Sequence, residues 1–185
     1  MRINLGCGFD KRDGFVNVDK FTACEPDVLM DIESPPWPFD SDCVDYILAK
    51  HVLEHVGRTA EDLGAILREV YRICKPGGRF EVHVPHHRHD TFHSDPTHVR
   101  PFTRLTFEMM SRKRNEEWIR ARANYTMLAL MYGIDFEIED ASQEYDAHWV
   151  RKLQAGEVTR EQLRDLALTQ NNIIREIRVV LRAVK

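Results

Sequence analysis

The sequence predicts an α/β fold built on a mostly parallel sheet, and three features indicate it. An apolar run at residues 3–5 leads into Gly6-Cys7-Gly8, and a second apolar run closes at Asp19. Short continuous apolar runs are typical of strands that are buried on both faces of a parallel sheet. The third feature is an amphipathic helix at residues 59–74, whose apolar stripe would face the sheet.

Four strands are expected before this helix, and a proline-rich loop separates the last two. Pro35, Pro36 and Pro38 lie around Trp37. Proline fixes φ and lacks an N–H donor, so this segment is predicted to be an extended surface loop. The strands are expected at residues 2–5, 15–19, 28–30 and 44–49.

The helix has clear end signals. Thr59 and Asp62 resemble a capping box with aspartate in place of glutamate. Pro76-Gly77-Gly78 is predicted to end the helix, because proline and glycine are typical just past a helix terminus. A fifth strand follows at residues 80–85, where apolar and polar residues alternate.

The second half of the chain departs from simple alternation of strands and helices between residues 86 and 132. We interpret this segment as a substrate-binding insertion in a single domain that spans residues 1–185. The last strand alternates apolar with basic residues, which favours a place at the sheet edge. Helices are expected at residues 103–110, 116–131 and 159–168, and strands at residues 136–139 and 177–183.

Composition limits the class of protein. The content of 43% hydrophobic and 30% charged residues is ordinary for a globular domain, and the net charge of -4 gives no global reason to expect nucleic acid. The four cysteines form no C-x-x-C pair, which argues against a zinc ribbon or a disulfide framework and favours a reduced, cytoplasmic setting. There is no leader-like start, and no apolar run approaches the ~20 residues that span a bilayer.

Four segments of the first 85 residues form a recognisable series. They are Leu5-Gly6-Cys7-Gly8, then Val18-Asp19, then Asp31-Ile32 with residues 37–45, and then His51-Val52-Leu53-Glu54-His55-Val56 leading to Pro76-Gly77-Gly78. In order and spacing they resemble the motifs of class I S-adenosylmethionine (SAM) dependent methyltransferases, and in particular a compact, type 11-like subgroup.

The resemblance implies a Rossmann-like three-layer sandwich whose seven-stranded, mostly parallel sheet ends in an antiparallel last strand. The link from Gly8 to Asp19 is shorter than in most of the family, so the first helix is expected to be a stub or absent. With no segment before the first strand to cover the donor, the acceptor pocket is expected from residues 86–132, from residues 141–158 or from another subunit of a homo-oligomer.

The resemblance also implies how SAM would be bound. The backbone at Gly6 and Gly8 would meet its amino-acid end, and Asp19 would accept from the ribose hydroxyls, since a carboxylate offers only acceptors. Asp31 would accept from the adenine amino group. The remaining residues of the implied site are Lys20 beside the ribose, the backbone of Ile32 at the adenine ring, and His51 as a wall of the pocket.

Residues 85–98 are unusually rich in histidine and aspartate, and three interpretations stay open. A metal site is one, but none of the spacings matches a recognised ligand pattern, so no metal ligand is predicted. Acid–base catalysis by His86, Asp95 or His98 is the second, because histidine changes charge near neutral pH. The third is a polar loop whose histidines pack, cap or contact substrate.

The predicted function is therefore transfer of a methyl group from SAM to an oxygen or nitrogen atom of a small-molecule or sugar-like acceptor. The motifs of base-amine, cytosine-C5 and radical methyltransferases are absent. Two alternatives are a non-catalytic SAM-binding subunit or sensor, and a nucleic-acid methyltransferase, which rests only on the basic cluster at residues 112–122. We expect a small-molecule substrate and no membrane partner. The acceptor itself is not specified by the sequence.

Overall fold

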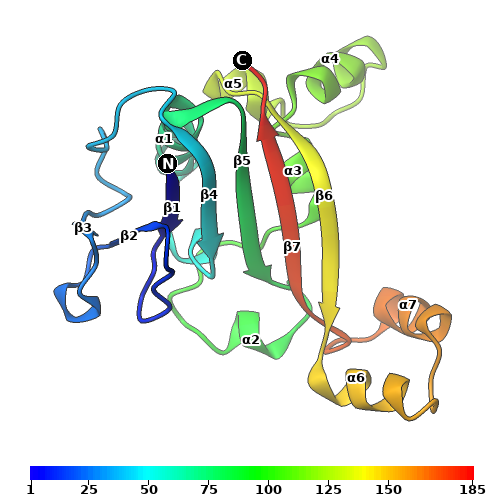
Figure 1. Ribbon diagram of the computed structural model, residues 1–185. Helices are drawn as coiled ribbons and strands as arrows, with labels where there is room; N and C mark the ends of the chain where they lie inside the picture. The colour runs from blue at the N-terminus through cyan, green and yellow to red at the C-terminus, as the bar shows by residue number, and fades with distance from the viewer.

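A single seven-stranded sheet runs through the molecule in the order β3-β2-β1-β4-β5-β7-β6 (Figure 1). The computed structural model describes residues 1–185. The strands are β1 (Arg2–Leu5), β2 (Val16–Asp19), β3 (Val28–Leu29), β4 (Val44–Lys50), β5 (Cys74–Pro85), β6 (Phe136–Tyr145) and β7 (Ile174–Ala183).

The direction of the strands agrees with the predicted Rossmann-like α/β fold. β1 pairs in parallel with β2 and β4, and β4 pairs in parallel with β5. β7 is antiparallel to both of its neighbours, β5 and β6. The expectation that the last strand lies at the edge is wrong, since β6 is the edge strand. The reason is visible in Val179, Val180 and Leu181, which are all buried, as an interior strand requires.

Helix α1 covers one face of the sheet and has the predicted capping box. Thr59 Oγ1 accepts from the Asp62 N–H at 3.1 Å, and the Thr59 N–H donates to the Asp62 carboxylate at 3.1 Å. The helices are α1 (Ala60–Ile73), α2 (Asp90–His93), α3 (Arg104–Glu108), α4 (Arg112–Arg120), α5 (Leu128–Tyr132), α6 (Ala147–Gln154) and α7 (Arg160–Thr169), with 3-10 turns η1 (Thr22–Cys24) and η2 (Leu53–His55).

Two helix predictions need correction. The single helix expected at residues 116–131 is divided into α4 and α5, and the chain turns between them at Arg122, which has a φ of 53°. Helix α4 begins earlier than expected because the Ser111 hydroxyl accepts from the Arg114 N–H at 3.2 Å. Helix α6 was not predicted, although Asp146 caps it through the His148 N–H at 2.8 Å.

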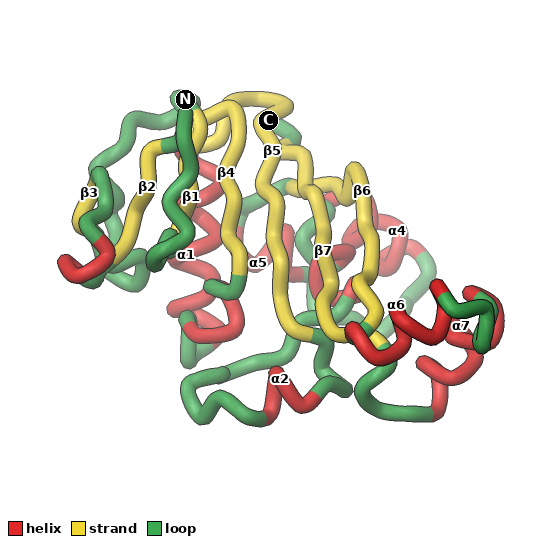
Figure 2. Tube along the Cα trace, turned by 60° about the horizontal axis from the view of Figure 1, so that its bottom comes forward, coloured by secondary structure: helices red, strands yellow, loops and turns green.

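The expected third layer is missing. Helices α1, α3 and α5 lie on one face of the sheet, and no helix lies on the face turned to the viewer in Figure 1 (also Figure 2). Right-handed crossovers place the β1–β2 and β2–β3 connections on the opposite face from the β4–β5 connection. Those connections contain no α-helix, only η1, so this face has no helical layer. The prediction that the first helix is a stub or absent is confirmed, and its absence leaves one face of the sheet without helices.

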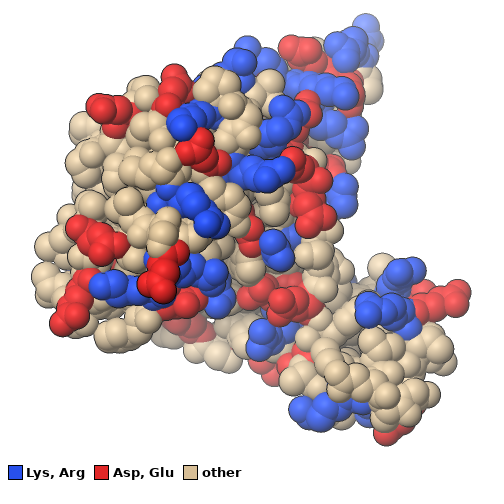
Figure 3. Space-filling model, in the orientation of Figure 1, with Lys and Arg blue, Asp and Glu red and all other residues tan.

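Loops and charged side chains take the place of the missing layer. The Asn4 amide, on the uncovered face of β1, donates to the Asp10 carbonyl at 2.8 Å and so holds the loop after Gly8 against the sheet. On β5, β6 and β7, acidic and basic side chains are interspersed (Figure 3), and they form ion pairs such as Arg79 with Glu139 and Arg178 with Glu81.

The apolar core lies between the sheet and helices α1, α3 and α5. Its largest fully buried side chains include Phe80, Phe102, Phe107 and Phe136. No helix of the chain is both long and apolar enough to span a membrane. Helices α6 and α7 extend past the ends of β6 and β7 as a separate lobe (Figure 1).

Candidate functional site

The carboxyl ends of β1, β2 and β3 bring the predicted SAM-binding residues together. The Gly8 N–H donates to Asp19 Oδ2 at 2.8 Å, which closes the turn after β1 onto the end of β2. The Met30 N–H donates to the Asp19 carbonyl at 2.9 Å, so Asp31 follows directly beside it. A parallel sheet ends its strands at one edge, and ligands bind at this edge where the strand order reverses.

Gly6 is required at its position by local packing. It has a φ of 65°, and a Cβ built there would lie 2.6 Å from Cγ2 of Val52, a residue that follows β4. Gly8 also has a positive φ, 49°, but a Cβ there would meet open space. The first glycine therefore allows the close approach of two strand ends, and the second leaves room in front of the backbone.

Asp19 is nearly buried and its carboxylate orders the turn around it. Its Oδ1 accepts from the Phe21 N–H at 2.9 Å, while its Oδ2 is engaged by Gly8. No basic side chain pairs with it. Each carboxylate oxygen has two lone pairs, so both oxygens keep the capacity to accept one more hydrogen bond. Lys20 is exposed, and its ammonium lies 5.6 Å from the Phe21 ring centroid.

The segment after β3 offers both an acceptor and a donor. Asp31 Oδ1 accepts from the Glu33 N–H at 3.0 Å, which leaves its second oxygen without a partner in the chain. The Ile32 carbonyl accepts from Trp37 Nε1 at 3.1 Å, while the Ile32 N–H has no acceptor in the chain. The pair fits the adenine edge that the family resemblance implies for it.

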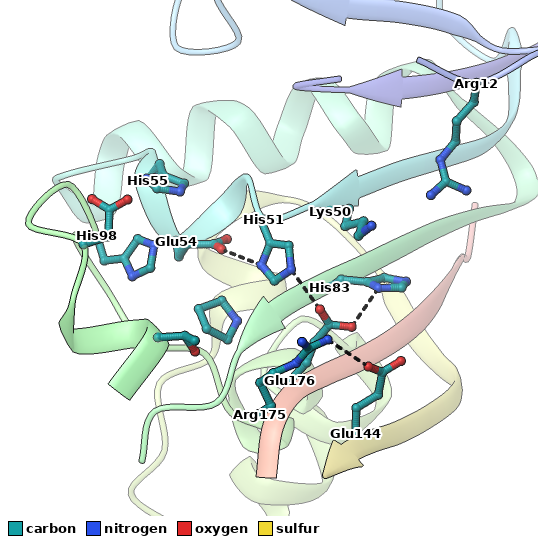
Figure 4. Close-up of a pocket in the computed structure, with 13 residues that line it drawn as sticks. Arg12, Lys50, His51, Glu54, His55, His83, His98, Glu144, Arg175 and Glu176 are labelled. Atoms are coloured by element: carbon teal, nitrogen blue, oxygen red, sulfur yellow. Dashed lines mark hydrogen bonds and ion pairs between the residues drawn. The ribbon is translucent and has the colours of Figure 1, made fainter. Parts of the chain in front are cut away.

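His51 lies next to these residues, at the end of β4, between two carboxylates. Its Nδ1 is 3.2 Å from Glu54 Oε1 and its Nε2 is 2.8 Å from Glu176 Oε2 (Figure 4). Glu176 is on β7, whose amino end lies at this edge because the strand is antiparallel. Its other oxygen lies 3.1 Å from Nδ1 of His83, and His83 Nε2 lies 2.7 Å from Glu81. Carboxylates and imidazoles thus alternate along the edge.

These contacts between carboxylates and imidazoles shift the pKa values of His51, His83 and Glu176. The carboxylates of Glu176 and Glu54 raise the pKa of His51 to about 9, against the opposing effect of burial. Burial also opposes the charged form of His83, but Glu176 and Glu81 outweigh it and raise its pKa above the ordinary 6.5. Burial would raise the pKa of Glu176, but the two histidines outweigh it and hold that pKa well below 4.5. His51 therefore carries a proton at neutral pH, and the protonated form of His83 is favoured.

A cavity of about 600 Å³ opens beside His51. Pro85 is the only lining residue without a polar side chain. Both segments that were expected to supply an acceptor pocket contribute to its wall, residues 86–132 through Asp95 and His98 and residues 141–158 through Glu144. The full lining consists of Arg12, Lys50, His51, Glu54, His55, His83, Pro85, Thr91, Asp95, His98, Glu144, Arg175 and Glu176 (Figure 4).

The structure separates the three predicted catalytic residues. Asp95 and His98 line this cavity, but His86 lines a different one with Tyr145 and Ile174. The His86 ring packs 4.3 Å from that of His87, and its Nδ1 accepts from the Arg88 N–H at 3.2 Å. Burial lowers the pKa of His86 to about 4, so it is neutral, and the structure gives it a packing and turn-forming environment.

Several cavity residues were missed by the sequence analysis. Glu176 and Arg175 come from β7, and His83 lies near the carboxyl end of β5, a strand that was assigned only by its apolar alternation. The one signal in the sequence was the presence of polar residues inside strands, which indicates a polar surface rather than a buried layer. Their convergence depends on the register of β7 against β5.

Comparisons with known proteins agree with the fold. Residues 6–82 match the model of a family described as a methyltransferase domain. A SAM-dependent methyltransferase from Archaeoglobus fulgidus has a similar structure, with a TM-score of 0.62 and 16% identity over 98% of this chain and 85% of that one. A SAM-dependent methyltransferase from Methanosarcina mazei gives 0.55 and 14%, over 99% and 92%.

A third similar structure contains ligands. It is the 1,6-didemethyltoxoflavin-N1-methyltransferase of Burkholderia thailandensis, with bound 1,6-didemethyltoxoflavin and S-adenosylhomocysteine. Its TM-score is 0.50 at 14% identity, over 100% of this chain and 71% of that one. No curated protein sequence matches the chain.

We expect Gly6→Ala to destabilise the fold by about 2–4 kcal/mol, since it combines left-handed backbone strain with overpacking against Val52. Gly14→Ala is the matched control. Its φ is 76°, but a Cβ there meets nothing within 4 Å, so only the backbone strain of about 1–2 kcal/mol applies. Urea unfolding measures both. Equal losses in the two variants would contradict the role of Val52.

The variant His83→Gln tests whether His83 carries a charge, through the pH dependence of the free energy of unfolding. Because the pKa of His83 is raised in the folded chain, its charge stabilises the fold fully below pH 6.5 and loses this effect as pH rises through the raised pKa. Glu81 and Glu176 face it, and Lys50 is its register neighbour on β4. We expect a loss of about 2 kcal/mol at pH 6 and a much smaller one near pH 10.

The matched control is His148→Gln, at an exposed histidine of α6. Chemical unfolding at both pH values gives the free energy of unfolding for each variant. A loss in His83→Gln that stays constant between pH 6 and pH 10 would show that His83 packs without carrying charge.

Proposed function

We propose that the chain is a SAM-dependent methyltransferase and that it methylates an oxygen or nitrogen atom of a small-molecule or sugar-like acceptor. Bound SAM would supply a methyl group that its sulfonium sulfur already activates. The chain then has to hold SAM and align the acceptor, and alignment alone accounts for much of the rate that an enzyme adds.

The residues at the ends of β1 to β3 fit SAM in their hydrogen-bonding capacity. Asp19 keeps acceptor capacity on both oxygens for the ribose hydroxyls. Asp31 has one oxygen without a partner, and the Ile32 N–H is without an acceptor in the chain. Gly8 leaves open space before its backbone. These are the partners that a ribose, an adenine and an amino-acid end require.

The acceptor class is supported by the cavity beside His51, and this observation carries the proposal. Its volume of about 600 Å³ is in the range of small-molecule sites. Its wall is made of charged and polar side chains, with Pro85 as the exception, which favours a hydroxyl-rich or amine-bearing molecule over an apolar one. Asp95 and His98 line this wall and are positioned to contact an acceptor, whereas His86 is not.

We expect Asp19→Asn to weaken binding of S-adenosylhomocysteine by about 100-fold, because two charge-assisted hydrogen bonds to the ribose are lost or reversed. Isothermal titration calorimetry measures the affinity. Asp13→Asn, at an exposed carboxylate on the loop between β1 and β2, is the control and should bind as the wild type does. A wild-type chain that does not bind S-adenosylhomocysteine would refute the proposed cofactor.

Arg175→Ala separates acceptor binding from SAM binding. Arg175 lines the cavity and pairs with Glu144 at 3.4 Å, and it is not among the residues at the SAM edge. With a panel of polyols, amino sugars and hydroxy acids, we expect a product that is heavier by one methylene group. The variant should lose about 10-fold in kcat/KM while it keeps its affinity for S-adenosylhomocysteine.

Mass spectrometry of product and S-adenosylhomocysteine gives the readout of this screen. Unchanged kcat/KM in Arg175→Ala would contradict the placement of the acceptor. Tight SAM binding without turnover on any member of the panel would support the alternative, a SAM-binding subunit or sensor.

A further inference from the structure

Three side chains from two distant segments converge on one corner of the cavity. Glu54 and His55 belong to η2, after β4, and His98 follows α2. One potential ligand atom from each lies within 4.8 Å of the other two. The backbone holds the segments together, because the Val99 N–H donates to the Glu54 carbonyl at 2.7 Å. We propose that Glu54, His55 and His98 bind a divalent transition-metal ion.

The hydrogen bonds of the two imidazoles leave one lone pair on each. His98 Nδ1 lies 2.7 Å from the Phe92 carbonyl oxygen, which can only accept, so Nδ1 carries the hydrogen and Nε2 is bare. His55 Nδ1 lies 2.8 Å from Thr97 Oγ1. The Thr97 hydroxyl donates to Asp95 Oδ1 at 2.6 Å, so its oxygen accepts from His55 Nδ1 and again Nε2 is bare.

This arrangement is the one that metal-binding histidines adopt. A histidine ligand donates its second ring N–H to a carbonyl or carboxylate, which fixes the tautomer and the ring orientation. Phe92 serves His98 in this way, and the Thr97–Asp95 pair serves His55. The two rings are 4.5 Å apart between centroids.

Glu54 supplies an independent observation. Its side chain is 1% exposed, and its Oε1 is paired with His51. Its Oε2 is buried and has no hydrogen-bond partner in the chain. A buried carboxylate oxygen without a partner is costly, and native structures normally provide one. A cation at the corner shared with His55 and His98 would be that partner.

The donor set indicates which ions fit. Two imidazole nitrogens and one carboxylate oxygen are the ligands of catalytic Zn²⁺ sites, and they also suit Fe²⁺ and Co²⁺. Bonds of about 2.1 Å separate tetrahedral ligand atoms by about 3.4 Å. Because the ligand atoms lie within 4.8 Å of one another, they need to approach by at most about 1.4 Å, which side-chain rotation can supply.

The remaining coordination positions face the cavity, since all three ligands line it. A small acceptor with a hydroxyl group would bind there through its oxygen, which the ion would polarise. This last step rests on the proposed function. The metal site itself rests only on the three side chains and their hydrogen bonds.

The test titrates Zn²⁺ into the untagged, chelator-treated chain, with Co²⁺ absorption as the spectroscopic probe. We expect one equivalent of Zn²⁺ and a tetrahedral or five-coordinate Co²⁺ spectrum. His98→Gln and Glu54→Gln should each lose more than about 100-fold in affinity, since even a lost second-layer hydrogen bond costs about 10–100-fold. His93→Gln is the matched control, because His93 is an exposed histidine of the same segment whose Nε2 contacts the His87 carbonyl.

Two variants at Thr97 test the site without removing a metal ligand, so that misfolding is less of a concern. Thr97→Val removes the acceptor of His55 Nδ1–H and should lose about 10–100-fold in Zn²⁺ affinity, and Thr97→Ser should restore it. Absence of stoichiometric Zn²⁺ binding, binding of Mg²⁺ in preference to Zn²⁺, or wild-type affinity in His98→Gln would overturn the proposal. S-adenosylhomocysteine binding by the metal-free chain is measured in parallel, so failure of the metal site and failure of the proposed function are told apart.

Discussion

The antiparallel entry of β7 is the constraint on which the cavity depends. Parallel strands present only their carboxyl ends at this edge, whereas β7 begins there and places Glu176 between His51 and His83. One buried carboxylate thus contacts two histidine rings, of which His51 follows β4 and His83 lies on β5. Because a buried ion pair tolerates the loss of one partner poorly, the position of His51 is tied to the pairing of β5 with β7.

The missing layer has a second effect on the same edge. Where crossover helices are absent, the uncovered face of β4, β5 and β7 has to be polar, and Tyr46, Glu81 and Arg178 form a chain of contacts across it. That chain continues through His83 to Glu176. The charged surface of the sheet and the wall of the cavity are therefore one continuous network, which begins at Glu54 and passes out to the solvent-exposed face.

How far the sequence predicts the site follows from the range of the contacts involved. Gly6, Gly8 and Asp19 are close in sequence, and the turn that joins them is specified by local spacing, so the sequence predicts their meeting. Glu176 meets His51 only through the register of a late strand, which no local pattern encodes. The prediction that β7 is the edge strand is wrong for the same reason, because no local pattern encodes its pairing with β6. The alternation of apolar and basic residues in β7 favoured an edge strand, but the structure shows that β6 pairs with its outer side and that Val180 is buried.

The histidine-rich segment shows why composition alone misplaces chemistry. Most of its histidines serve the segment itself: His86 accepts from Arg88, His89 pairs with Thr91 and Asp146, and His93 contacts the His87 carbonyl. Only His98 both lines the cavity and keeps a free ring nitrogen there. Its partners in the proposed metal site come from η2, far away in the chain. A ligand set divided between two segments has no fixed spacing that a sequence pattern could match. The structure indicates the site instead, because Glu54 Oε2 is buried there without a hydrogen-bond partner.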